Sequence, residues 1–319
     1  MLETTFTKLV GCSVPIQQAG MGGAATPELA AAVSDAGGLG MVNMVMVPAA
    51  EVATAVAGLA KATSGPVGIN FLMPFLDLAV VDAAAPHCRV VEFFYGDPQA
   101  GLVERVHAAG ALADWQVGTA DEAKAAVQAG CDFVVAQGVE AGGHVRGTVG
   151  LLALLDEVLH VVEVPVLAAG GIGSARAMAA ALAAGADGVR VGTRFVATAE
   201  SGSHPAYMQA LVEASAADTV ITTAFSVMWP DAPHRVLRSA VAAMEAFPGE
   251  TTGEMDLGAA RMPIPRGAVP SPTRDTTGAI PAMALYAGES VGDVVRVQSA
   301  GDVVRELAEG AERLLRGRS

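Results

Sequence analysis

Short apolar runs rich in Val, Ile and Gly alternate along the chain with Ala-rich amphipathic stretches. The runs begin roughly every 20–30 residues, which suits repeated strand–helix units. Near-continuous apolar runs are typical of parallel strands buried on both faces. The pattern predicts eight strands, near Pro15–Gly20, Leu39–Asn43, Val67–Leu72, Val90–Tyr95, Ala111–Val117, Phe133–Gln137, Val166–Ala169 and Gly188–Val191.

Helix boundary signals separate these runs. Thr26-Pro27 combines a capping hydroxyl with Pro at the first helical position, and Thr119 and Ser174 open two further amphipathic stretches. Eight strands with helical crossovers predict an α/β fold, a (β/α)8 barrel of the TIM type. A doubly wound open sheet is the alternative, although it would usually need fewer strands.

The strand pattern fades after the eighth run. Residues 203–290 hold many Pro, Gly, Thr and Met, which predicts a helical and loop insertion after strand eight, as a lid region over the barrel mouth. Val303–Arg316 has the apolar stripe of a closing helix. We therefore expect residues 1–202 and 291–319 to form the barrel.

Composition narrows the class of protein. The chain has 319 residues, of which 52% are hydrophobic and 16% charged, so it is too apolar to be disordered. Its net charge of −14 argues against nucleic acid or an anionic membrane surface as a partner. No window supplies the roughly 20 uninterrupted apolar residues of a membrane span.

The N-terminal residues and the cysteines indicate a compartment. Glu3 and Lys8 lie in the first residues, where a secretory signal would need an apolar run. Cys12, Cys88 and Cys131 form an odd set without a CxxC motif. A disulfide framework is therefore not expected, and a cytoplasmic protein is. An assembly of identical subunits stays open.

Two glycine-rich turns follow the seventh and eighth predicted strands. The first contains Gly170 and Gly171, and the second contains Gly192 and Thr193. Glycines let backbone N–H groups approach an anion closely, and the loops after strands seven and eight form the usual phosphate site of this barrel. These turns predict phosphate binding, whereas their alternative role is tight chain reversal alone.

The loop after strand six carries the main chemical candidate. His144 follows Gly142-Gly143 directly, at the predicted barrel mouth. Imidazole suits proton exchange and anion stabilisation near neutral pH. His87, His107 and His160 fall in or beside predicted crossover helices and are expected at the surface.

Two further histidines lie after strand eight, and two amides end apolar strands. His204 follows the eighth turn, and His234 lies in the insertion. No histidine–carboxylate spacing indicates a metal site. Asn70 and Gln137 could bond a heterocycle edge or a sugar-like hydroxyl, or instead their own loops.

Together these blocks resemble the nitronate monooxygenase (2-nitropropane dioxygenase) family, and most are shared with the FMN-dependent enoyl-ACP reductases. The resemblance spans residues of about 6–210 and is most specific in the sixth-strand block Gln137–His144; a tail block, Ala282–Gly288, also resembles the nitronate enzymes. It implies an FMN-dependent barrel in which the flavin takes electrons from an alkyl nitronate and passes them to oxygen, giving a carbonyl compound and nitrite.

The resemblance also implies roles for individual residues. His144 is the implied catalytic residue, and Val145 after it departs from the usual pattern, which leaves the substrate preference open. The implied FMN contacts are Ala19, Gly20, Met21, Asn70, Gln137, Gly142, Gly143, Gly170, Gly171, Gly192 and Thr193. Around the substrate we expect residues of the insertion and tail, including Trp229, His234, Met283 and Tyr286.

Other functions stay open. The main alternative is an NAD(P)H-dependent FMN reductase acting on an enoyl thioester or a quinone, although neither glycine-rich turn completes a GxGxxG dinucleotide motif. A barrel that acts only as a binding or regulatory module is a third hypothesis. A nucleotide-oxidising barrel with a thiolate nucleophile is excluded, because no Cys follows Cys131.

Overall fold

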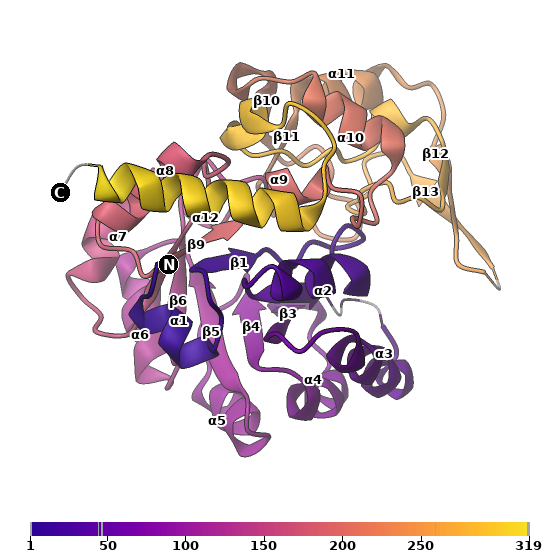
Figure 1. The fold of residues 1–319 in the computed structure, drawn as a ribbon. Helices are drawn as coiled ribbons and strands as arrows, with labels where there is room; N and C mark the ends of the chain where they lie inside the picture. The colour runs from indigo at the N-terminus through magenta and orange to yellow at the C-terminus, as the bar shows by residue number, and fades with distance from the viewer. Residues whose placement is uncertain (1, 44, 46, 259, 318–319) are drawn as a thin grey trace.

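Eight parallel strands form the central sheet of the computed structural model, which describes residues 2–43, 45, 47–258 and 260–317. The strands are β1 (Ile16–Gln18), β2 (Gly40–Asn43), β3 (Val67–Leu72), β4 (Val90–Phe94), β5 (Leu112–Val117), β6 (Phe133–Gln137), β8 (Val166–Ala169) and β9 (Gly188–Val191). Their order is β1-β9-β8-β6-β5-β4-β3-β2, and a bridge between Gln17 and Leu39 joins the two edges. The predicted TIM-type barrel is confirmed (Figure 1).

Helices surround this barrel and cover the outer face of the strands (Figure 1). They are α2 (Pro27–Asp35), α3 (Ala49–Ala62), α4 (Leu78–Ala84), α5 (Ala100–Ala108), α6 (Ala120–Gln128), α7 (Leu151–Leu159), α8 (Ala175–Ala183) and α12 (Ala300–Arg316). The expected caps form, because the side-chain oxygens of Thr26, Thr119 and Ser174 each accept a backbone N–H of the first turn. Short 3-10 turns η1 (Met73–Phe75) and η2 (Ala85–His87) flank α4.

The inside of the barrel has an apolar end and a polar end. At the amino ends of the strands, α1 (Thr5–Val10) closes the barrel, and Phe6 packs edge-on against Phe133 at a centroid distance of 5.4 Å. Toward the carboxyl ends, buried polar side chains replace the apolar ones. The barrel interior is therefore closed by apolar packing at the amino ends of the strands and carries buried polar side chains toward their carboxyl ends.

The insertion packs over the carboxyl ends around a separate apolar core that includes Leu211, Phe225 and Val236. The short helix α9 (Thr193–Val196) leads from β9 toward the insertion. The elements of the insertion are α10 (Pro205–Val212), η3 (Ala216–Asp218), β10 (Thr219–Thr222), β11 (His234–Leu237), α11 (Arg238–Ala246), β12 (Thr251–Asp256), β13 (Arg261–Pro265), β14 (Thr276–Gly278) and η4 (Ile280–Ala282), and η5 (Glu289–Asp293) spans its end. The expectation of helices and loops alone was incomplete, since five short strands also form here. Residues 1, 44, 46, 259, 318 and 319, which fall within the expected ranges, lie outside the described residues.

Two small antiparallel sheets organise these strands. One has the order β13-β12-β14 and projects from the insertion (Figure 1). The other joins β10 and β11 to β7 (Gly143–His144), which comes from the loop after β6. His144 pairs with His234 in that sheet, and the Val145 N–H donates to the Pro233 carbonyl at 2.9 Å. The loop that carries His144 is thus held by the insertion.

Candidate active site

A cavity of about 610 Å³ opens at the carboxyl ends of the barrel strands. Loops after six of the barrel strands line it, together with Phe94 of β4, Gln116 of β5 and parts of the insertion. Every expected cofactor residue from Ala19 to Thr193 contributes to its wall, as does His144. The structure therefore brings together residues that are distant in the sequence.

The glycine-rich turns form one side of this cavity. Gly170 and Gly171 have φ angles of +105° and +68°, which side-chain-bearing residues rarely adopt. A Cβ on Gly142 would lie 2.4 Å from the backbone nitrogen of Gly288, whose N–H donates to Thr193 Oγ1 at 3.0 Å. The turn at Gly170 and Gly171, the loop at Gly142 and the turn at Thr193 therefore lie close together and present backbone without side chains to the cavity. This arrangement suits an oxygen-rich anion.

The two predicted amides have different surroundings. Gln137 Nε2 donates to the carbonyl of His144 at 3.0 Å, while Gln137 Oε1 is buried with no partner among the described residues. Asn70 is already bonded, since its Oδ1 accepts from Asn43 and its Nδ2 donates to Glu92 at 2.5 Å. Gln137 thus keeps a buried acceptor free, whereas Asn70 serves chiefly to shape the cavity floor.

The imidazole of His144 lies between the cavity and the insertion. Trp229 stacks on it, with a centroid distance of 4.0 Å and an interplanar angle of 21°. Burial, and then the nearby His234, lower the pKa of His144 from 6.5 to about 3. Its Nε2 is buried and, in the part of the chain that the structure describes, makes no hydrogen bond. The ring is therefore neutral at physiological pH, and its Nε2 can form a hydrogen bond with a ligand.

Trp229 is held rigidly above His144. The residues Met228 and Asp231, on either side of it, have φ angles of +83° and +55°, which cost about 1 kcal/mol or more each for residues other than glycine. Tyr95 and Phe75 of the barrel loops contact the indole edge-on, at centroid distances of 4.7 and 5.2 Å. This tight turn was not predicted from the sequence, where Trp229 stood only as an expected neighbour of the substrate.

The other three residues expected around the substrate, after Trp229, do not all reach the cavity. Tyr286 lines the cavity, and its hydroxyl donates to the Val269 carbonyl at 2.7 Å. His234 lies behind His144, with Nδ1 2.9 Å from the Ala232 carbonyl and Nε2 accepting the Phe225 N–H, and it is not part of the cavity wall. Met283 packs in a small separate core, also away from the cavity.

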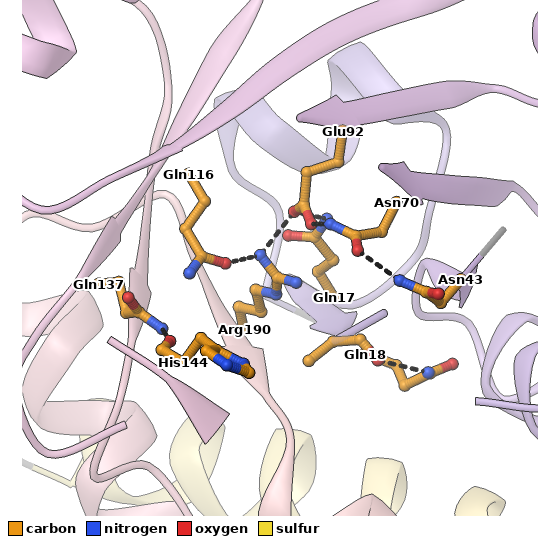
Figure 2. A network of polar contacts seen from close by, with 10 residues as sticks. Gln17, Gln18, Asn43, Asn70, Glu92, Gln116, Gln137, His144 and Arg190 are labelled. Atoms are coloured by element: carbon orange, nitrogen blue, oxygen red, sulfur yellow. Dashed lines mark hydrogen bonds and ion pairs between the residues drawn. The ribbon is translucent and has the colours of Figure 1, made fainter. Parts of the chain in front are cut away.

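A polar network inside the barrel floor was missed by the sequence analysis (Figure 2). Arg190 of β9 forms an ion pair of 2.7 Å with Glu92 of β4 and donates a second hydrogen bond to Gln116 of β5. Gln17 Nε2 donates to the same Glu92 carboxylate at 3.2 Å. A detectable signal existed, because Glu92 and Arg190 each interrupt a strand that is otherwise apolar.

Asp114 of β5 lies beside this network and has an unusual pKa. Its side chain is fully buried, and neither carboxyl oxygen has a hydrogen-bond partner in the described ranges. Burial first, and then the neighbouring Glu92, raise the pKa of Asp114 well above its usual range, which Arg190 only partly offsets. Burial therefore disfavours the charged form of Asp114, and the ion-pair partner of Arg190 is Glu92.

The described residues hold neither a cluster of metal-binding side chains nor a membrane-spanning helix. No group of three His, Cys, Asp or Glu side chains is placed to hold a metal ion. No described helix combines the length and apolar character needed to cross a bilayer. The chemistry of this region therefore rests on the cavity, the glycine turns, His144 and the buried network.

Comparison with known proteins gives a consistent picture. The family model described as "Nitronate monooxygenase" matches residues 3–84 and 77–310. A curated relative from Rhodococcus jostii (strain RHA1), named (3aS,4S,5R,7aS)-5-hydroxy-7a-methyl-1-oxo-octahydro-1H-indene-4-carboxyl-CoA dehydrogenase, is 36% identical over 247 residues. That match covers 75% of this chain and 66% of the relative, slightly under two thirds of its length.

Solved structures match over the whole chain. FabK from Thermotoga maritima is 30% identical, with a TM-score of 0.82 and full coverage of both chains. The nitroalkane oxidase from Streptomyces ansochromogenes is also 30% identical, with a TM-score of 0.78 and coverage of 98% of this chain and 99% of that one. The barrel, the insertion and their relative placement are thus shared with solved proteins.

Proposed function

Because the chain belongs to the nitronate monooxygenase family, we propose that it is an FMN-dependent oxidoreductase that uses oxygen to convert alkyl nitronates into a carbonyl compound and nitrite. The observation that carries this proposal is the neutral His144, whose ring nitrogen is unpaired beside a cavity with a glycine-lined anion site. The partners are accordingly a small-molecule substrate and oxygen.

The residues present fit FMN. The bare backbone at Gly170, Gly171 and Gly192 suits the phosphate, and the buried, unpaired Oε1 of Gln137 can accept a hydrogen bond from a ribityl hydroxyl. A cavity of about 610 Å³ falls in the usual range for cofactor sites. Bound FMN would supply the two-electron chemistry that amino acids lack, taking electrons from substrate and passing them to oxygen.

The state of His144 favours a nitronate over a neutral nitroalkane. A general base works best with a pKa near the operating pH, and burial holds the pKa of His144 at about 3, far below it. A nitronate has already lost its carbon proton and carries negative charge on oxygen. The N–H of a neutral imidazole can donate a hydrogen bond to that oxygen, and Trp229 excludes water from the other face of the ring.

Anaerobic spectroscopy tests the proposal. Purified protein should show FMN absorption, which a nitronate bleaches and NAD(P)H does not. His144→Ala should keep FMN yet lose most turnover, while His160→Ala, at a side chain that is 72% exposed, should leave turnover unchanged. Full turnover by His144→Ala would remove this residue from the mechanism.

A second candidate is an NAD(P)H-dependent FMN reductase that acts on an enoyl thioester or a quinone. Two observations favour it: the name of the Rhodococcus relative, which is a dehydrogenase of a carboxyl-CoA compound, and an apolar extension of the cavity. Met255 and Met262 of the β12–β13 hairpin and Leu257 between them line that extension. Rapid bleaching by NAD(P)H, without bleaching by a nitronate, would establish this candidate instead.

A cytoplasmic location is also part of this proposal, and the oligomeric state needs a separate measurement. Cys12, Cys88 and Cys131 are free thiols, and burial raises the pKa of Cys12 and Cys88 to about 12. Free cysteines are usual in a reducing cytoplasm, which supports a cytoplasmic location. Size-exclusion chromatography with light scattering would decide between a monomer and an assembly of identical subunits.

A further inference from the structure

Arg190 is a buried cation with unused hydrogen-bond donors. Its side chain is 7% exposed and contributes to the floor of the cavity. Both of its side-chain bonds, to Glu92 and Gln116, use Nη1 (Figure 2). Among the described residues nothing bonds Nε or Nη2, although burial of a guanidinium normally requires partners for its donors. The free side of Arg190 therefore needs an acceptor from the cavity.

The network fixes where the charge of Arg190 acts. Glu92 is fully buried and does not reach the cavity wall; its oxygens accept from Asn70, Gln17 and Arg190. The second carboxyl nearby, Asp114, is also fully buried and forms no part of the cavity wall. The guanidinium is thus the charged group of this cluster that faces the cavity, while the balancing carboxylate stays below it.

The position of Arg190 relative to the phosphate site limits what the acceptor can be. Arg190 lies two residues before Gly192 on β9, and its guanidinium reaches across the barrel to β4 and β5. A ligand whose phosphate sits on the glycine turns would extend over this centre. The FMN ring has a polar pyrimidine half with two carbonyls and an apolar dimethylbenzene half.

The two halves of such a ring match two regions of the cavity. Its floor is polar, with Arg190, Asn70 and Gln116, whereas its mouth is apolar, with Phe75 and Met228. Burying a carbonyl without a donor is costly, and so is burying an unpaired guanidinium, so both costs are avoided only if the pyrimidine half lies over the floor.

We propose that Arg190 binds the pyrimidine half of FMN and stabilises the negative charge that this half gains on reduction. This inference rests on the proposed FMN site. When two electrons from the substrate and one proton reach the ring, the ring gains one net negative charge, and a fixed cation at the floor offsets it without reorganisation. Arg190 thereby makes the flavin a better electron acceptor, and Glu92 and Gln116 act as positioning residues that hold its guanidinium.

The test is the relative affinity of the protein for reduced and oxidised FMN, obtained from the midpoint potential measured with reference dyes. This measurement needs no substrate. In Arg190→Gln, the affinity for reduced FMN relative to that for oxidised FMN should be at least tenfold lower than in the wild type. For a two-electron couple, a tenfold change in this ratio lowers the midpoint potential by about 30 mV. Arg190→Lys, which keeps the charge, should stay within threefold of the wild type.

A control addresses folding. Arg190→Gln leaves the buried Glu92 without its cation, which is strongly destabilising. The double variant Arg190→Gln/Glu92→Gln removes both charges, and its potential should fall in the same direction. An unchanged affinity ratio in a folded Arg190→Gln or double variant overturns the inference, and a raised KM for nitronate with an unchanged potential would assign Arg190 to the substrate instead.

The result is separable from the proposed function. If the protein binds FMN and the variants shift its potential, but only NAD(P)H reduces it, the nitronate proposal fails while the role of Arg190 stands. If titration of the apoprotein followed by FMN fluorescence shows no binding to the wild type, both proposals fail.

Discussion

The lowered pKa of His144 makes a quantitative prediction about stability in acid. The imidazole has a pKa of 6.5 when the chain is unfolded, and burial lowers it to about 3 in the folded protein. Between these values the unfolded chain binds a proton that the folded protein does not. The contribution of the neutral imidazole to stability is therefore complete above pH 6.5 and is lost as the pH falls toward 3.

The size of the effect follows from the two pKa values. From pH 7 to pH 5 the unfolded imidazole takes up most of a proton and the folded one almost none, which costs about 2 kcal/mol of unfolding free energy. His144→Gln removes the titrating group. The wild type should therefore lose about 2 kcal/mol more than this variant over the same pH interval.

Urea unfolding of the apoproteins at pH 7 and pH 5 measures this difference, because bound FMN would otherwise add its own stabilisation. Lost packing on Trp229 affects the variant at both pH values and cancels in the comparison. His160→Gln, at an exposed side chain, should behave as the wild type does. Equal losses in the wild type and His144→Gln would show that the ring is not shielded from protons and would refute the reasoning.

Three further results are expected. Gly171→Asp should weaken FMN binding at least tenfold more than Gly171→Asn in a fluorescence titration, because both variants share the φ of +68° and only the first places a carboxylate beside the phosphate. Trp229→Ala should raise the pKa of His144 toward 6.5, seen as an imidazole NMR signal that titrates above pH 5. Gly142→Ala should destabilise the protein by about 1–3 kcal/mol in thermal unfolding, because its Cβ would meet backbone at 2.4 Å, whereas Gly22→Ala has open space and should be neutral.

The barrel was predictable because its signals are local and repeated. Each buried strand forms a continuous apolar run, and caps such as Thr119 mark where a helix begins. The short strands of the insertion give no such signal. β12 is mostly polar with an interior Gly, and β13 contains two Pro. β7 is two residues long and pairs with a segment about 90 positions later in the chain. Pairing of that kind depends on tertiary contacts, which a sequence pattern does not contain.

The candidate site also has a part that could be predicted from the sequence and a part that could not. Glycines and His144 could be placed at the barrel mouth because parallel strands end at a common edge. The cover by Trp229 could not, since it depends on how the insertion folds. Nor could the pairing of Arg190 with Glu92, which requires knowing that β9 and β4 face each other across the barrel.

The two-residue strand β7 has a consequence for how this protein can be altered. Because residues 143–144 pair with β11, the loop with the imidazole and the insertion share one small sheet. A chimera that received residues 203–290 from a relative would also receive a new edge for that loop, and its imidazole would be re-aimed. The placement of this imidazole and the fold of the insertion are therefore linked, and a graft that preserves that placement must carry the loop after β6 along with the insertion.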